Sequence, residues 1–317
     1  MANNNIHGVI PVDKPAGMTS HDVIYKMRRV LGTKKVGHTG TLDPSVTGVL
    51  PIVIGDATKL TEILQQRDKR YIATVTLGRT TDTEDATGKT METAEVIEGS
   101  ITKKDVLSAI EKFKGDYHQM VPLYSSVRVN GRKLYWYAHE GIEVERPSRT
   151  VQIKNLKLTS DVRYEDGSIS FDIDVTCSKG TYIRTLAVDI GAALGYPAHM
   201  SYLRRTGSCG FSIDEAIRLD DLRDGTVKAE PIPIIDMLDD ILRRDIQNNE
   251  DLLFQITHGQ KIVKSDILTM LGLTELDTVL FTRGEMPLGI YKTHPEKPDQ
   301  LKPFKMFNNL WGTYGNN

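Results

Sequence analysis

The sequence alternates irregularly between two hydrophobic periodicities, and this mixture is what most restricts its fold. Residues 71–77 and 169–177 place apolar side chains at every second position, as in a strand with one buried face. Residues 20–31, 102–113 and 183–190 repeat apolar side chains at helical spacing. Because neither pattern dominates and no internal repeat is present, the sequence predicts an α+β (mixed α/β) fold.

Residues typical of helix ends flank two of the helical segments. Ser20 is expected to cap the first helix, and Gly32 suits its C-terminal end. Thr102 and Asp105 are spaced as a capping pair for the second helix, and Gly115 is expected to close it. These signals predict where the two helices begin and end.

Composition excludes several classes of protein. The 317 residues are 39% hydrophobic and 26% charged, which is typical of a globular chain. No apolar run approaches the ~20 residues that span a bilayer, and the N-terminus lacks the layout of a secretory signal. Cys177 and Cys209 are too few for a disulfide framework, and no Cys-x-x-Cys or His-x-x-x-His cluster predicts a metal site. We expect a cytoplasmic protein, with a monomer as the default.

An uneven distribution of charge predicts a domain boundary. Residues 214–240 hold nine acidic and three basic side chains, and this stretch ends near Pro231-Ile232-Pro233. We interpret it as a tether and place the boundary near residue 240. Residues 1–240 then form a large domain, and residues 241–317 form a small one that is predicted to be β-rich.

Basic side chains gather locally although the net charge is −2. Phosphate contacts respond to local charge, so such clusters can bind RNA, although paired Lys and Arg also simply keep a surface soluble. Between residues 124 and 137 the basic residues are interleaved with aromatics, as in an RNA-gripping loop. The clusters are Arg28-Arg29, Lys34-Lys35, Arg67/Lys69/Arg70, Arg128/Arg132/Lys133 and Arg204-Arg205.

A loop with three glycines and one aspartate leads into the apolar segment 49–54. Its core reads GHTGTLDP at residues 37–44. Glycine permits close approach of a ligand to the backbone, and Pro44 restricts Asp43 to an extended conformation. This combination suits a presented catalytic carboxylate, but Asp-Pro also opens ordinary turns.

The order of residues in this loop resembles the catalytic motif of the TruB family, the synthases that make pseudouridine in the T-arm of tRNA. Further blocks resemble the family in the same order across residues 8–213. They read VDKPAGMTS at 12–20, KRY at 69–71, LGRTTDTEDATG at 77–88, VPLYSS at 121–126, GRKLY at 131–135, CSKGTYIR at 177–184 and YLRRTG at 202–207.

The resemblance implies a reaction, a partner and a fold. The enzyme would isomerise uridine 55 in the T-arm stem-loop of tRNA, with no membrane involved. Because uracil stays in the product, no cofactor is needed. The implied fold has a central mixed, largely antiparallel sheet flanked by helices and loops, which makes residues 1–240 the catalytic domain. Residues 241–317 are similar in length to the family's small PUA-type RNA-binding domain.

The resemblance also implies roles for seven residues. Asp43 would be the catalytic carboxylate, because glycosidic cleavage leaves positive character on the ribose carbon. Arg184, about one turn into its helix, would pair with Asp43, and Tyr71 would stack on the target base after that base has flipped. The other implied contacts are His38 in the region that the base vacates, Tyr182 and Leu203 in the uracil pocket, and Lys14 at a phosphate.

Two other functions compete with this interpretation. A non-catalytic tRNA-binding or RNA-chaperone protein could use the same basic clusters, with Asp43 merely shaping a loop. A nucleoside or glycoside hydrolase would release the free base, but retaining glycosidases usually use two carboxylates. Conversion of uridine at a fixed position separates the synthase from both.

Overall fold

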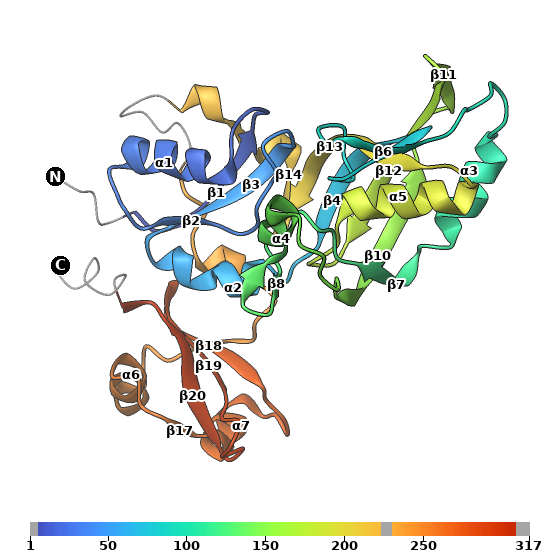
Figure 1. The fold of residues 1–317 in the computed structure, drawn as a ribbon. Helices are drawn as coiled ribbons and strands as arrows, with labels where there is room; N and C mark the ends of the chain where they lie inside the picture. Colours follow the sequence, from blue (N-terminus) through green and yellow to red (C-terminus); the bar gives the residue numbers. More distant parts are fainter. Residues whose placement is uncertain (1–5, 223–229, 309–317) are drawn as a thin grey trace.

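The computed structural model describes residues 6–222 and 230–308 and contains two main sheets (Figure 1). The larger sheet has eleven strands and the smaller one has five. The strands of the large sheet are β1 (Gly8–Lys14), β2 (Val36–His38), β3 (Thr47–Ile54), β4 (Lys69–Leu77), β7 (Gly115–Met120), β10 (Ser148–Leu158), β11 (Arg163–Glu165), β12 (Ser168–Cys177), β13 (Ala198–Ser208), β14 (Phe211–Ser212) and β15 (Ile217–Arg218).

The order of strands confirms the mixed, largely antiparallel sheet. The main path is β15-β1-β3-β13-β4-β12-β10-β7, with β2, β14 and β11 paired beside β3, β13 and β12. Two of its described pairs, β1 with β15 and β3 with β13, are parallel, and the others are antiparallel. The short contact between β3 and β13 joins the two halves of the sheet and brings Arg205 beside Gly48.

Helices cover each half of the large sheet and bury its apolar face. α1 (Ser20–Leu31) packs on β1, β2 and β3. α3 (Lys103–Glu111) and α5 (Ile183–Leu194) pack on β4, β10 and β12, and α5 runs across these strands in Figure 1. A short 3-10 helix, η1 (Gly55–Leu60), and α2 (Thr61–Leu64) connect β3 to β4. The alternation predicted for residues 71–77 and 169–177 therefore lies in β4 and β12, whose inward side chains form one core.

The helix caps differ in part from the prediction. Thr19, not Ser20, caps α1, because its hydroxyl accepts the Asp22 N–H at 3.1 Å while the Asp22 carboxylate accepts the Thr19 N–H. The capping pair Thr102 and Asp105 is confirmed for α3. The helix ends at Glu111, however, and Gly115 begins β7 instead of closing the helix.

Residues 121–147 form an arm between β7 and β10. The arm carries the two-stranded hairpin β8 (Arg128–Val129) and β9 (Arg132–Lys133), followed by α4 (Leu134–Glu140). Its ends meet where the Val121 N–H donates to the Pro147 carbonyl at 2.9 Å. A second small hairpin, β5 (Arg79–Thr81) with β6 (Thr90–Thr93), follows β4.

The C-terminal part is β-rich, as predicted. Its sheet has the order β16-β18-β19-β20-β17 and packs on two helices. Leu280, Ile290 and Phe307 share a core with Val9 and Val49 of the large sheet. The small sheet therefore packs against the large domain, while the boundary near residue 240 stays a prediction. Its elements are β16 (Arg243–Asp245), α6 (Glu250–Thr257), β17 (Ile262–Val263), α7 (Lys264–Leu271), β18 (Thr278–Arg283), β19 (Met286–Thr293) and β20 (Gln300–Met306).

The acidic stretch is not a free tether in its described parts. β15 pairs with β1, and Ile232 exchanges two backbone hydrogen bonds with Val9. Three short 3-10 helices, η2 (Ile213–Glu215), η3 (Leu219–Asp221) and η4 (Ile235–Met237), lie along it. Apolar side chains between the acidic ones, such as Leu222, are buried and hold the stretch on the body of the protein. Residues 223–229 lie outside the described residues.

Candidate active site

Asp43 lies in the loop between β2 and β3, which spans residues 39–46 and is called the aspartate loop here. Its carboxylate is 47% exposed. The Val46 N–H donates to the Asp43 carbonyl at 3.0 Å and closes a tight turn. The following strand, β3, is buried along nearly its whole length. A rigid strand thus presents a carboxylate at the surface, as expected of a site built on a fixed scaffold.

Side chains from distant parts of the sequence hold the aspartate loop. The Ser20 hydroxyl donates to the Leu42 carbonyl at 3.1 Å and accepts the Leu42 N–H at 2.9 Å. The Lys14 ammonium donates to the Pro44 carbonyl at 3.2 Å. The Arg205 guanidinium donates to the Gly40 carbonyl at 3.1 Å. Because these partners satisfy backbone carbonyls on both sides of Asp43, they fix the position of the backbone that carries its carboxylate.

Arg184 comes close to Asp43 as the resemblance implied, although its contact is not bidentate. Its Nε lies 3.6 Å from the Asp43 Oδ2, an ion-pair distance that is too long for a hydrogen bond. Nη1 and Nη2 donate instead to the carbonyls of Thr83 and Tyr124, each at 3.0 Å. Arg184 is the second residue of α5, so it lies in the first turn and not a full turn along. The buried guanidinium thus joins three loops at one point.

Tyr71 and Leu203 share one face of the large sheet with Arg205. β4 and β13 pair antiparallel, with Tyr71 opposite Arg205 and Ala73 opposite Leu203. Both side chains are partly buried against the core under α5. Burial raises the pKa of the Tyr71 phenol, while the neighbouring Arg205 acts in the opposite direction. The phenol therefore keeps its proton at neutral pH.

His38 and Tyr182 are each held by a hydrogen bond to a neighbouring group. Burial, followed by the charge of Arg205, lowers the pKa of the His38 imidazole. The neutral ring accepts the Gly40 N–H at 3.2 Å through Nδ1. Tyr182 caps α5, and the fully buried Gln119 binds both its N–H and its carbonyl. Gln119 thereby fixes the first turn of α5, where Arg184 begins.

Lys14 is not available to a phosphate, contrary to the expectation. Its side chain is fully buried, and its ammonium donates to the carbonyls of Pro15, Met18 and Pro44. Three N–H groups meet three carbonyls, so every donor is used. Burial lowers the pKa of this ammonium. Lys14 thus supports the aspartate loop through its hydrogen bond to the Pro44 carbonyl.

Several predicted basic clusters are also used inside the protein. Arg67 donates to the Met237 carbonyl and pairs with Asp239 and Asp240. Arg70 forms an ion pair with Asp174, and Arg204 forms one with Asp13 at 2.7 Å. Lys69 and Arg205 are buried. These side chains hold strands together, and the hypothesis that they bind phosphate is wrong for the buried members.

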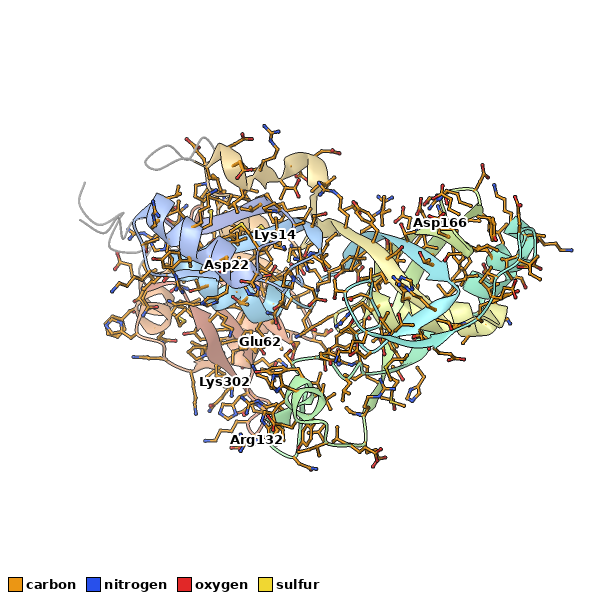
Figure 2. All side chains as sticks on the ribbon, turned by 45° about the horizontal axis from the view of Figure 1, so that its top comes forward. Lys14, Asp22, Glu62, Arg132, Asp166 and Lys302 are labelled. Carbon is orange, nitrogen blue, oxygen red and sulfur yellow. The ribbon has the colours of Figure 1, made fainter. Side chains whose placement is uncertain are left out.

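The arm keeps its basic side chains at the surface. Arg132 lies over the Trp136 ring at 5.1 Å, and Lys133 lies over the Tyr135 ring at 5.4 Å. Figure 2 shows Arg132 where the hairpin and α4 project from the body of the molecule. Cations stacked on aromatic rings suit contact with RNA, and the RNA-gripping loop stays a prediction for this segment.

Glu84 is a partly buried carboxylate next to Arg184, with 13% of its side chain exposed, that was not assigned to the site from the sequence. The Thr185 hydroxyl donates to its Oε2, and Arg146 of the arm lies 3.5 Å from its Oε1. Its backbone has a φ of 64°, a conformation that only a few per cent of non-glycine residues adopt. Burial raises the pKa of Glu84, and its hydrogen bond to Thr185 opposes the rise. Glu84 fixes the turn whose Thr83 carbonyl binds Arg184.

Replacing Glu84 with glutamine is expected to change how stability depends on pH. A raised folded-state pKa contributes stability below the ordinary glutamate pKa and loses it as pH rises through the raised value. The amide does not titrate. The melting temperature of Glu84→Gln minus that of the parent should therefore rise by a few degrees between about pH 4 and pH 8. Thermal melts across this range measure it, with the exposed Glu98→Gln as control. A difference that stays flat or falls with pH contradicts the expectation.

The sequence also did not predict the supporting roles of Arg205, which was placed only in a basic cluster, and of Gln119. For Arg205 a signal existed, because it stands two residues after Leu203 in a strand and so shares its inward face. For Gln119 no local pattern marks a side chain that serves the backbone of α5.

Within residues 6–222 and 230–308, no group of three or more His, Cys, Asp and Glu side chains is placed to hold a metal ion. No helix of this part of the chain has the length and apolar character needed to cross a membrane.

Comparisons with known proteins agree with the fold. Residues 28–183 match the TruB family pseudouridylate synthase N-terminal domain, and residues 184–252 match the tRNA pseudouridylate synthase B C-terminal domain. The chain is 47% identical over 306 residues to a tRNA pseudouridine synthase B of Staphylococcus saprophyticus, covering 95% of this chain and 99% of the relative. A Bacillus subtilis tRNA pseudouridine synthase B is 46% identical over 306 residues, covering 95% and 97%. A chain from a crystal structure of a Cbf5-Nop10-Gar1 complex superimposes with a TM-score of 0.66 at 26% identity, covering 96% and 86%.

These matches and the fold define a pseudouridylate synthase, an isomerase. The chain belongs to the TruB family of these synthases, because the family models and the relatives together span nearly its whole length. The family resemblance found in the sequence motifs is thereby confirmed, and so is the prediction of an enzyme.

Proposed function

We propose that this chain converts uridine 55 in the T-loop of tRNA into pseudouridine, with Asp43 as the catalytic carboxylate. The observation that carries the proposal is the half-exposed Asp43 carboxylate beside the buried Arg184 guanidinium, with Tyr71 on β4 of the same large sheet. The names of its curated relatives support tRNA as the substrate.

The reaction exchanges one bond for another and needs no oxidant or energy source. The N1–C1′ bond breaks, the uracil turns, and C5 bonds to C1′. C5 then loses its proton, and N1 ends protonated, so atoms and charge balance. Cleavage leaves positive character on the ribose, which a fixed carboxylate stabilises. Asp43 can serve by attack on C1′, attack on the base at C6, or removal of a ribose proton, and Arg184 directs the carboxylate in each route.

The target uridine must leave its loop to reach Asp43. Base flipping costs a few kcal/mol, which replacement contacts partly offset. We assign stacking on the base and assistance in the loss of the C5 proton to Tyr71, the uracil pocket to Tyr182 and Leu203, and the vacated region to His38. The basic and aromatic arm grips the RNA backbone, and the C-terminal β-rich module is a second RNA contact of the PUA type.

The direct test is to incubate an unmodified tRNA transcript with the protein alone. Carbodiimide modification followed by primer extension should produce a stop at the T-loop uridine. A transcript with cytidine at that position is the matched control and should give no stop. If the protein binds the transcript but no stop appears, it is an RNA-binding protein and the proposed enzyme function is wrong. Release of free uracil would instead indicate a hydrolase.

A further inference from the structure

Arg205 is the largest of the fully buried side chains in the described structure, with 2% of its surface exposed. Its Nε donates to the Val49 carbonyl at 2.6 Å, and its Nη2 donates to the Gly40 carbonyl at 3.1 Å. Gly40 precedes Asp43 by three residues, and Val49 follows it by six. One guanidinium therefore joins the start of the aspartate loop to β3, the strand that follows the loop.

The backbones of β3 and β13 approach each other closely at Arg205. Arg205 pairs in parallel with Gly48, and a Cβ on Gly48 would lie 2.1 Å from the Arg205 carbonyl oxygen. Gly48 also has a φ of +110°, which favours glycine. Because β3 and β13 approach so closely here, the Arg205 guanidinium lies between the Gly40 and Val49 carbonyls.

Arg205 also faces a second residue of the site. Its partner across the β4–β13 pair is Tyr71, and its charge acts on the Tyr71 phenol and on the His38 imidazole. Burial excludes a contact between Arg205 and RNA phosphate. A buried guanidinium is costly unless its donors are used; one donor of Arg205 binds the aspartate loop at Gly40, and another binds β3 at Val49.

We propose that Arg205 is a positioning residue for the reaction: its guanidinium holds the aspartate loop closed and sets the distance of the Asp43 carboxylate from Tyr71 and Arg184. This inference rests on the proposed role of Asp43. An apolar side chain could fill the same volume, but it would leave the Gly40 and Val49 carbonyls without their donor. The loop would then move as a unit, with Asp43 on it.

The test compares Arg205→Met and Arg205→Lys with the parent. Arg163→Met is the matched control, because Arg163 donates two hydrogen bonds to Asp172 at the far end of the large sheet. Single-turnover and steady-state kinetics on a tRNA transcript give kcat and KM. Hydrogen–deuterium exchange without RNA reports the amides of residues 39–49. Thermal melts establish that each variant is folded at the assay temperature.

Arg205→Met is expected to lower kcat about 100-fold, as a misplaced catalytic group does, with KM changed less than about threefold. Exchange should rise in residues 39–49 and stay unchanged in β4 and β12. Arg205→Lys, which keeps one donor, should recover part of both effects and carries the test if Arg205→Met does not fold. If exchange in residues 39–49 is unchanged in a folded variant, Arg205 does not hold the aspartate loop, even if Asp43 is catalytic. If exchange rises in residues 39–49 but kcat is unchanged, Arg205 is not a positioning residue for the reaction. If the parent protein itself has no activity, the proposed function is wrong, but the exchange result still tests whether Arg205 holds the loop.

Discussion

Asp43→Asn is expected to lower kcat on a tRNA transcript by at least about 10³-fold, because the amide has no charge with which to stabilise or attack the ribose carbon. Asp43→Glu should also lose most activity, since the longer side chain moves the carboxylate away from Arg184. Because Asp43 is 47% exposed and its 3.6 Å contact with Arg184 is too long for a hydrogen bond, the melting temperature should stay within about 2 °C of the parent. Rapid-quench assays of tritium released from C5-labelled uridine would give kcat.

The matched control for Asp43→Asn is Asp116→Asn, an exposed carboxylate at the far end of the large sheet. It removes the same charge and should keep kcat within about twofold. Filter binding should give both variants the affinity of the parent for the transcript, because the proposed role of Asp43 is in the reaction and not in RNA binding. An Asp43→Asn protein with more than a tenth of parental kcat at equal RNA affinity would refute the catalytic assignment.

Local periodicity was a reliable guide to the fold. β4 and β12 follow the alternation of residues 71–77 and 169–177 because each strand buries one face under α5. The capping pair of Thr102 and Asp105 was predictable for the same reason, since its partners lie three residues apart. Where the interacting groups are neighbours in sequence, the local sequence pattern is enough to predict the structure.

The roles of the basic residues were not predictable from sequence in this way. Lys14 and Arg205 look like surface cations, but each donates to one carbonyl of the aspartate loop, Pro44 for Lys14 and Gly40, 165 residues away, for Arg205. The pairing of β1 with β3 brings Lys14 to this loop, and the pairing of β3 with β13 brings Arg205 there. Asp43 was found through the family motif, whereas the groups that support its loop needed the three-dimensional structure.

Arg184→Lys is expected to lower kcat about 100-fold, and Arg184→Met is expected to lower it further. A guanidinium reaches three partners in different directions, whereas an ammonium on a similar stem cannot span the Thr83 and Tyr124 carbonyls while approaching Asp43. A partly buried carbonyl left without its donor costs up to about 1–3 kcal/mol, so both variants should also melt below the parent.

The two consequences of changing Arg184 can be separated by measuring kcat below the melting transition of each variant. Arg163→Met should again keep activity, because Arg163 binds Asp172 away from the site. Hydrogen exchange should rise in residues 121–147, since the Tyr124 carbonyl ties the arm to the first turn of α5. If Arg184→Lys is folded and its kcat lies within fivefold of the parent, the guanidinium does not direct Asp43. The three carbonyl and carboxylate contacts would then serve only to join loops.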